Sequence, residues 1–144
     1  MQIQTANYTN AEVIYGNFLN VQGATITTGY PVAFTTTAAS LDGNQAVLPA
    51  TGQRHSFAGI AQADVADNTV GRFQCWGYNA SVFIFACGTS VTNTVDDVLG
   101  PNAGSVGVNS TGRVDILTPV IAMEAIGADV NSPGGYAKCF IKSM

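Results

Sequence analysis

Charged side chains are scarce in this chain of 144 residues. Asp, Glu, Lys and Arg make up 10% of it, whereas about a quarter is usual for a soluble domain. Nine acidic and five basic residues leave a formal net charge of −4, and no basic cluster is present to neutralise the phosphates of a nucleic acid. Disorder driven by charge is also excluded, because such segments carry few large apolar groups and 47% of this chain is hydrophobic.

Long apolar runs are missing too, since no segment approaches the roughly 18 continuous apolar residues of a membrane-spanning helix. The first seven residues, MQIQTAN, have neither the basic region nor the apolar run of a signal peptide. We therefore expect no membrane partner and synthesis in the cytoplasm. The length suits one compact domain.

Cysteine and histidine, which build many metal and catalytic sites, are few. Cys75, Cys87 and Cys139 form no CxxC motif, and an odd number in a reducing compartment predicts three buried thiols. The alternatives are an intermolecular or late disulfide and a reactive nucleophile. His55 is the single histidine, so the chain lacks the ligands of a zinc site. We predict that His55 is a polar loop residue, with an oligomer contact or a catalytic role as the alternatives.

Two pairs of carboxylates are candidates for a catalytic or a calcium site: Asp64 with Asp67, and Asp96 with Asp97. Such pairs occur in glycosidases and as calcium ligands. The first pair falls in an expected turn, where aspartate commonly accepts hydrogen bonds from nearby backbone. We therefore predict turn and capping roles, no catalytic residue, no metal and no cofactor, and a protein that is not an enzyme.

Polarity comes from uncharged residues: 15 Thr, 11 Asn, 8 Ser and 7 Gln, together with 16 Gly. Short runs of β-branched and aromatic residues alternate with Gly, Pro and Asn, which is typical of strands joined by tight turns. The sequence therefore predicts an all-β fold, either an antiparallel β-sandwich or a β-barrel. The expected strands are residues 24–28, 31–35, 46–48, 57–62, 71–76, 81–86, 105–108, 114–116, 120–125 and 136–141. Turns are expected at 28–29, 42–43, 77–79, 100–104 and 111–112.

The N-terminal segment differs from the rest of the chain. Residues 1–20 are polar, rich in Asn and weakly patterned. We predict that they form an extended arm or a loosely attached edge, and that residues 21–144 form a single β domain.

That β domain contains an internal duplication. Residues 63–76 read ADVADNTVGRFQCW, and residues 128–140 read ADVNSPGGYAKCF. With one residue deleted in the turn, Gly71 matches Gly135 and Cys75 matches Cys139. An apolar strand precedes each segment. This similarity predicts two pseudo-repeats, 21–80 and 100–144, with chance resemblance as the alternative. Residues 36–56 have no evident counterpart and form a central insertion in this interpretation.

One segment resembles a known family. FAGIAQ at 57–62, followed by ADNTVGRFQCWG at 66–77, is similar to the head decoration proteins of tailed bacteriophages, also called capsid cement proteins. The shared pattern is an apolar Gly-Ile-Ala strand, a short Ala/Asp loop, a glycine and an alternating strand that ends in glycine. The resemblance implies a β-rich virion protein on the capsid surface, without enzymatic activity. The implied partners are the major capsid protein and two further copies in a homotrimer.

Two functions follow as expectations. The first is a virion structural protein that decorates and stabilises the outside of a phage capsid, for which low charge suits wide and weakly polar contacts. The alternative is a carbohydrate-binding β-sandwich of a phage fibre or tail, in which exposed aromatic rings would stack on sugars. The aromatic residues considered for that role are Tyr8, Tyr15, Phe18, Tyr30, Trp76 and Tyr78.

Overall fold

The computed structural model describes residues 12–35, 43–49, 56–85, 98–102, 105–108, 120–124 and 135–143, and the regular structure in these ranges is β-strand. Within them, no helix could cross a membrane. The strands are β1 (Ile14–Asn20), β2 (Pro31–Phe34), β3 (Gln45–Val47), β4 (Phe57–Ala61), β5 (Val70–Phe85), β6 (Val98–Asn102), β7 (Ser105–Val108), β8 (Val120–Ala122) and β9 (Gly135–Lys142). The all-β prediction is confirmed.

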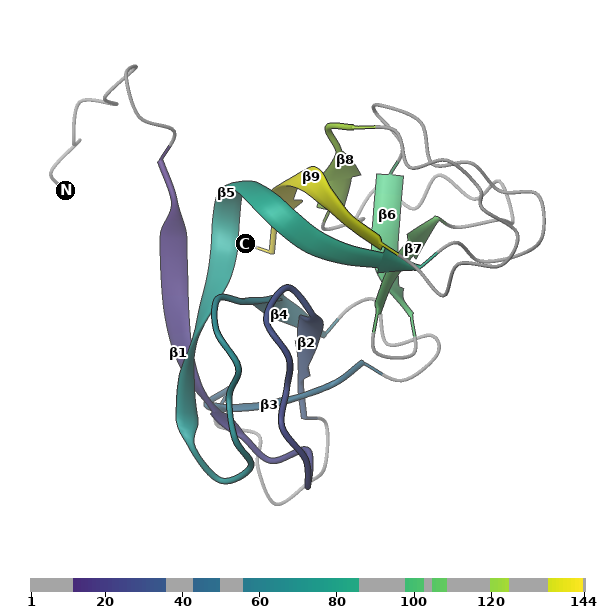
Figure 1. Ribbon diagram of the computed structural model, residues 1–144. Coiled ribbons are helices and arrows are strands. Elements are labelled where there is room, and N and C mark those ends of the chain that lie inside the picture. Colours follow the sequence, from purple (N-terminus) through teal and green to yellow (C-terminus); the bar gives the residue numbers. More distant parts are fainter. Residues whose placement is uncertain are drawn as a thin grey trace, which may run out of the picture.

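The strand pairings close into two five-stranded barrels that share β5 (Figure 1). In unit 1 the hydrogen-bonded order is β1-β3-β2-β4 and then the first half of β5, which pairs back with β1. In unit 2 the order is the second half of β5, then β7-β6-β8-β9, and β9 pairs back with β5. Closure of this kind leaves few strand edges open to solvent.

The two units have the same topology. In each unit the first strand pairs in parallel with the third, and the other four pairings are antiparallel. The purely antiparallel arrangement predicted from sequence is therefore wrong for β1–β3 and β5–β7. When Gly71 is aligned with Gly135, burial also agrees: Phe73, Cys75 and Gly77 are buried, and so are Ala137, Cys139 and Ile141.

The structure corrects the boundaries of the repeats. Unit 1 begins with β1 at Ile14, and unit 2 begins inside β5, so the repeats do not run over 21–80 and 100–144. The segment 36–56 contains β3, whose counterpart is β7. The residues of β3, 45–47, are therefore part of the repeat and do not belong to an insertion. Sequence comparison missed this match because both strands are short, three and four residues.

The N-terminal arm is also shorter than predicted. Ile14–Asn20 forms β1, which pairs with β5 from Ile14 opposite Trp76 to Leu19 opposite Val70. The side chain of Asn20 is fully buried. Weak alternation in this stretch, including Gly16 and two asparagines, concealed the strand. Residues 1–11 lie outside the described part of the chain.

The predicted turn at 77–79 is a bend within one continuous strand. Gly77 has a φ of +100° and a register shift follows between Asn79 and Val82. The buried Gln74 amide donates to the carbonyls of Trp76 and Tyr78, at 3.2 and 2.9 Å. These hydrogen bonds connect the backbone on both sides of the bend, so β5 continues as one strand from unit 1 into unit 2 (Figure 1).

Each unit has its own hydrophobic core, and β4 lies between the two. All five residues of β4 are buried. Ala58 and Ala61 belong to the core of unit 1, together with Phe73, whereas Phe57 and Ile60 belong to the core of unit 2. A register shift in the pairing with β2, where Gly59 lies opposite Val32 and Phe57 opposite Ala33, interrupts the alternation, so side chains three residues apart enter the same core. A strand buried between two cores in this way must be apolar throughout.

Candidate docking surface

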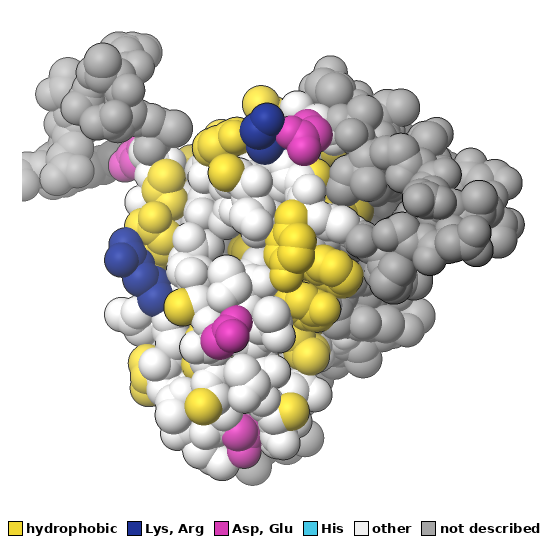
Figure 2. Space-filling view, viewed as in Figure 1, with side chains coloured by type: hydrophobic (Ala, Val, Ile, Leu, Met, Phe, Trp, Pro, Cys, Tyr) yellow, Lys and Arg dark blue, Asp and Glu magenta, His cyan; other side chains and the backbone are white. Residues whose placement is uncertain are grey.

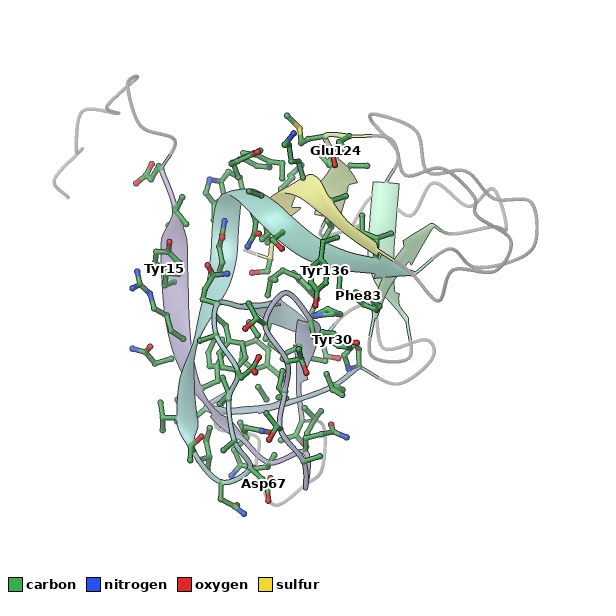
Figure 3. All side chains as sticks on the ribbon, viewed as in Figure 1. Tyr15, Tyr30, Asp67, Phe83, Glu124 and Tyr136 are labelled. Atoms are coloured by element: carbon green, nitrogen blue, oxygen red, sulfur yellow. The ribbon has the colours of Figure 1, made fainter. Side chains whose placement is uncertain are left out.

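An aromatic cluster lies where the two units meet. The junction cluster consists of Tyr30, which directly precedes β2, Phe83 on β5 and Tyr136 on β9 (Figure 3). The rings of Tyr30 and Phe83 stack with centroids 4.6 Å apart and planes 2° from parallel. Tyr136 meets Phe83 edge-on at 5.4 Å and is 51% exposed. Figure 2 shows an apolar patch in the middle of the same face, with uncharged polar groups next to it on the left.

Gly29 allows the segment before β2 to approach β5 this closely. Its φ is +82°, and its carbonyl accepts a 2.9 Å hydrogen bond from the backbone N–H of Phe83. A Cβ at position 29 would lie 2.7 Å from the carbonyl oxygen of Ser81 and 2.7 Å from the Tyr136 ring. Only glycine fits this position, so the turn predicted at 28–29 also positions the cluster.

Asp64 and Asp67 anchor backbone turns, as the sequence predicts. Asp64 Oδ1 accepts hydrogen bonds from the backbone N–H and the hydroxyl of Thr28, at 2.8 and 2.9 Å. Asp67 accepts from the backbone N–H of Gly23 at 2.8 Å and from the Asn68 amide at 2.7 Å. In the described ranges no three His, Cys, Asp or Glu side chains come together as a metal site would require.

The carboxyl of Asp64 should make stability depend on pH. The hydrogen bond from the backbone N–H of Thr28, and after it the one from the Thr28 hydroxyl, lower the pKa of the Asp64 carboxyl from its ordinary value. Because the folded pKa lies below the unfolded one, the contribution is present above about pH 4 and disappears as the pH falls through the folded pKa. We expect the Tm of the wild type to exceed that of Asp64→Asn at neutral pH, and the gap to narrow in acid. A gap of constant size down to about pH 3 would contradict this assignment.

The two described cysteines are buried free thiols, as predicted. Burial, with a smaller contribution from Glu124, raises the pKa of Cys139 to about 12. Burial also raises the pKa of Cys75. Thiols that stay protonated are poor nucleophiles and poor metal ligands, so neither residue marks a reactive site.

The remaining residues named from sequence are scattered. His55, Cys87, Asp96, Asp97 and Tyr8 lie outside the described ranges. Trp76 packs edge-on against Phe140, with ring centroids 5.5 Å apart, and Phe18 packs with Phe34 and Phe73 beside the core of unit 1. Tyr78 is 39% exposed on β5. Tyr15 is 41% exposed on β1, and the guanidinium of Arg72 lies 3.6 Å above its ring.

Sequence reasoning named only Tyr30 of the junction cluster. The sequence predicts Phe83 and Tyr136 only as strand residues, because each stands in an alternating segment with no nearby motif. A signal was nevertheless present. Both residues occupy strands of the second repeat, and Tyr30 directly follows the glycine of a predicted turn. What the sequence lacks is the cross-strand register, in which Phe83 stands opposite Tyr136.

Comparison with known proteins yields a likeness of fold. No protein-family model matches the chain, and no curated protein matches it. Among solved structures, the chain is similar to the N base of head fiber gp8.5 of bacteriophage phi29, with a TM-score of 0.52 and 11% sequence identity. The match covers 92% of this chain and 96% of that one. The likeness therefore extends over both units and is not confined to one of them.

Proposed function

We propose that this protein is a structural component of a bacteriophage virion. The observation that carries the proposal is the likeness to the head fiber base, which spans nearly the full length of both chains. The segment 57–77, with its similarity to phage head decoration proteins, points independently to the same class. In this structure that segment supplies β4, which both cores share, and the first half of β5.

The finer proposal is attachment to the outside of the capsid through the major capsid protein. The junction cluster suits such a contact, because interface centres are rich in aromatic residues and poor in charge. Asp64 is exposed beside the junction cluster, but its Oδ1 accepts hydrogen bonds from the backbone N–H and the hydroxyl of Thr28. When many copies bind one particle, weak individual contacts together give strong attachment. A homotrimer, which the family resemblance implies, belongs to the same proposal.

We further propose that the protein has no catalytic activity. This proposal is supported by the carboxylates of Asp64 and Asp67, which accept hydrogen bonds from backbone N–H groups of turns. It is also supported by the burial of Cys75 and Cys139. The carbohydrate-binding alternative has less support. The half-buried ring of Trp76 packs against Phe140, and Tyr30 and Phe83 stack on each other instead of presenting open faces to a sugar.

The test is co-sedimentation of the purified protein with phage shells in the unexpanded, expanded and genome-filled states. We expect binding to at least one state, and Tyr136→Ala should weaken it about tenfold or more, as for a central interface aromatic. Tyr78→Ala is the matched control, since it removes another exposed tyrosine away from the junction cluster. Failure to sediment with any shell would refute capsid attachment. A change in Trp76 fluorescence with glycans, in the absence of shells, would favour the alternative.

A further inference from the structure

The segment 28–30 of unit 1 contacts unit 2 through each of its three residues. The carbonyl of Thr28 accepts from the hydroxyl of Tyr136 on β9 at 3.4 Å, and the carbonyl of Gly29 accepts from the backbone N–H of Phe83 on β5 at 2.9 Å. The ring of Tyr30 stacks on the ring of Phe83. The position of this segment therefore determines whether the junction cluster is assembled (Figure 3).

Within unit 1, a carboxylate helps to hold this segment against residues 61–65. Backbone hydrogen bonds join the two stretches at both ends of their contact: Ile26 with Val65 through two bonds of 2.9 Å, and Gly29 and Tyr30 with Ala61 at 2.8 and 3.0 Å. Between these ends, the N–H of Thr28 donates to the side chain of Asp64 and not to a backbone carbonyl. Asp64 thus takes the place of a backbone acceptor at the point where the chain turns toward unit 2.

The bonds from Thr28 to Asp64 favour the ionised form of the carboxyl. Oδ1 accepts from both the backbone N–H and the hydroxyl of Thr28, at 2.8 and 2.9 Å. The backbone bond first, and then the hydroxyl bond, lower the pKa of Asp64 although its side chain is exposed. Hydrogen bonds to an ionised acceptor are roughly twice as strong as those between neutral groups. The carboxylate is therefore well suited to fix the position of Thr28.

We propose that Asp64 is a positioning residue for the junction cluster: its carboxylate holds the segment 28–30 against β5 and β9, so that the docking surface is assembled before it meets a partner. This inference rests on the proposed capsid attachment. When only a fraction of the molecules has the binding-competent surface, the apparent Kd rises by the inverse of that fraction. Loss of the two bonds should therefore weaken docking although every aromatic ring of the cluster is still present.

Asp64→Ala tests the proposal in the protein alone, and Asp67→Ala is the matched control. Each substitution removes one negative charge and one 2.8 Å bond from a backbone N–H, but Asp67 bonds Gly23 and lies at the far end of unit 1 from the junction cluster (Figure 3). In Asp64→Ala we expect the N–H of Phe83 to exchange with solvent about fivefold faster or more, and the NMR signals of the Tyr30 ring to shift. Asp67→Ala should leave both unchanged.

Two substitutions of Thr28 examine the same contact from the other side. Thr28→Val removes the hydroxyl and keeps the branched shape, whereas Thr28→Ser keeps the hydroxyl that donates to Asp64. We expect faster exchange at Phe83 in Thr28→Val and a rate near that of the wild type in Thr28→Ser. In co-sedimentation with shells, Asp64→Ala and Thr28→Val should bind about threefold to tenfold more weakly. Asp67→Ala and Thr28→Ser should bind as the wild type does.

Three results would overturn the role of Asp64. The first is unchanged exchange at Phe83 in both Asp64→Ala and Thr28→Val. The second is equal weakening of docking by Asp64→Ala and Asp67→Ala, because loss of a negative charge would then explain the effect. The third is docking at wild-type strength when exchange at Phe83 is faster. If the wild type sediments with no shell, the proposed function fails, and the exchange rates alone decide whether Asp64 positions the cluster.

Discussion

Replacement of Gly77 by alanine should lower the free energy of unfolding by about 3 kcal/mol. Two costs add. At a φ of +100° an L side chain is strained, which costs about 1–2 kcal/mol. The new Cβ would also fall against the backbone carbonyl oxygen of Glu12, and crowding of this kind costs about 1–3 kcal/mol. Glu12 cannot move freely, because β1 begins only two residues later and is paired with β5 there.

Gly23→Ala separates the two costs. Gly23 also has a positive φ, +80°, but an added Cβ would meet nothing within 4 Å. In urea titrations of the wild type and both variants, Gly23→Ala should therefore lose only about 1 kcal/mol of the free energy of unfolding, compared with about 3 kcal/mol for Gly77→Ala. Equal losses for both variants would show that contact with Glu12 contributes nothing and that the bend in β5 tolerates movement of the N-terminal residues.

The bend at Gly77 also shows how far the sequence could predict this fold. Alternating residues on both sides of Gly77 correctly predicted strands, and the glycine correctly marked a special backbone angle. Whether such a glycine reverses the chain or only bends it depends on distant contacts. Here the side chain of Gln74 keeps the strand continuous, because it donates to the carbonyl of Tyr78 and accepts from the Asn79 amide, both at 2.9 Å.

The similarity of the two units left a trace in the sequence at Gly71 and Gly135, which lie at the start of the last strand of each unit. A Cβ at Gly71 would collide with the buried side chain of Val65, whereas a Cβ at Gly135 would meet no described atom within 4 Å. The counterpart strands β3 and β7 share no residue pattern. They are equivalent because each pairs in parallel with the first strand of its unit. The local sequence of a strand does not show which strand it pairs with.

The candidate docking surface was less predictable than the fold. The low fraction of charged residues predicts a surface suited to contact with other proteins, and the sequence also predicts the turn at Gly29. The stacking of Tyr30 on Phe83 joins residues 53 positions apart, and their packing follows from the shared strand β5.

Asn20 holds together the loops at the far end of unit 1. Its side chain is fully buried. The amide nitrogen donates to the carbonyls of Ala24 at 2.8 Å and Val65 at 2.9 Å, and the amide oxygen accepts from the backbone N–H of Gln22 at 2.8 Å. It thus joins the segment after β1 to the segment before β5, where Ile26 and Val65 form a bridge.

Asn20→Ala should consequently lower the free energy of unfolding by about 3 kcal/mol, because partly buried backbone groups lose their partners and a small cavity remains. The loss should be concentrated locally, so the backbone N–H groups of Gln22 and Ile26 should exchange with solvent faster in hydrogen-exchange measurements. Asn17→Ala, an exposed asparagine on the same strand, is the matched control and should change stability by less than about 0.5 kcal/mol. If Asn20→Ala were equally mild, water would be replacing all three bonds, and the buried amide would not be what holds these loops together.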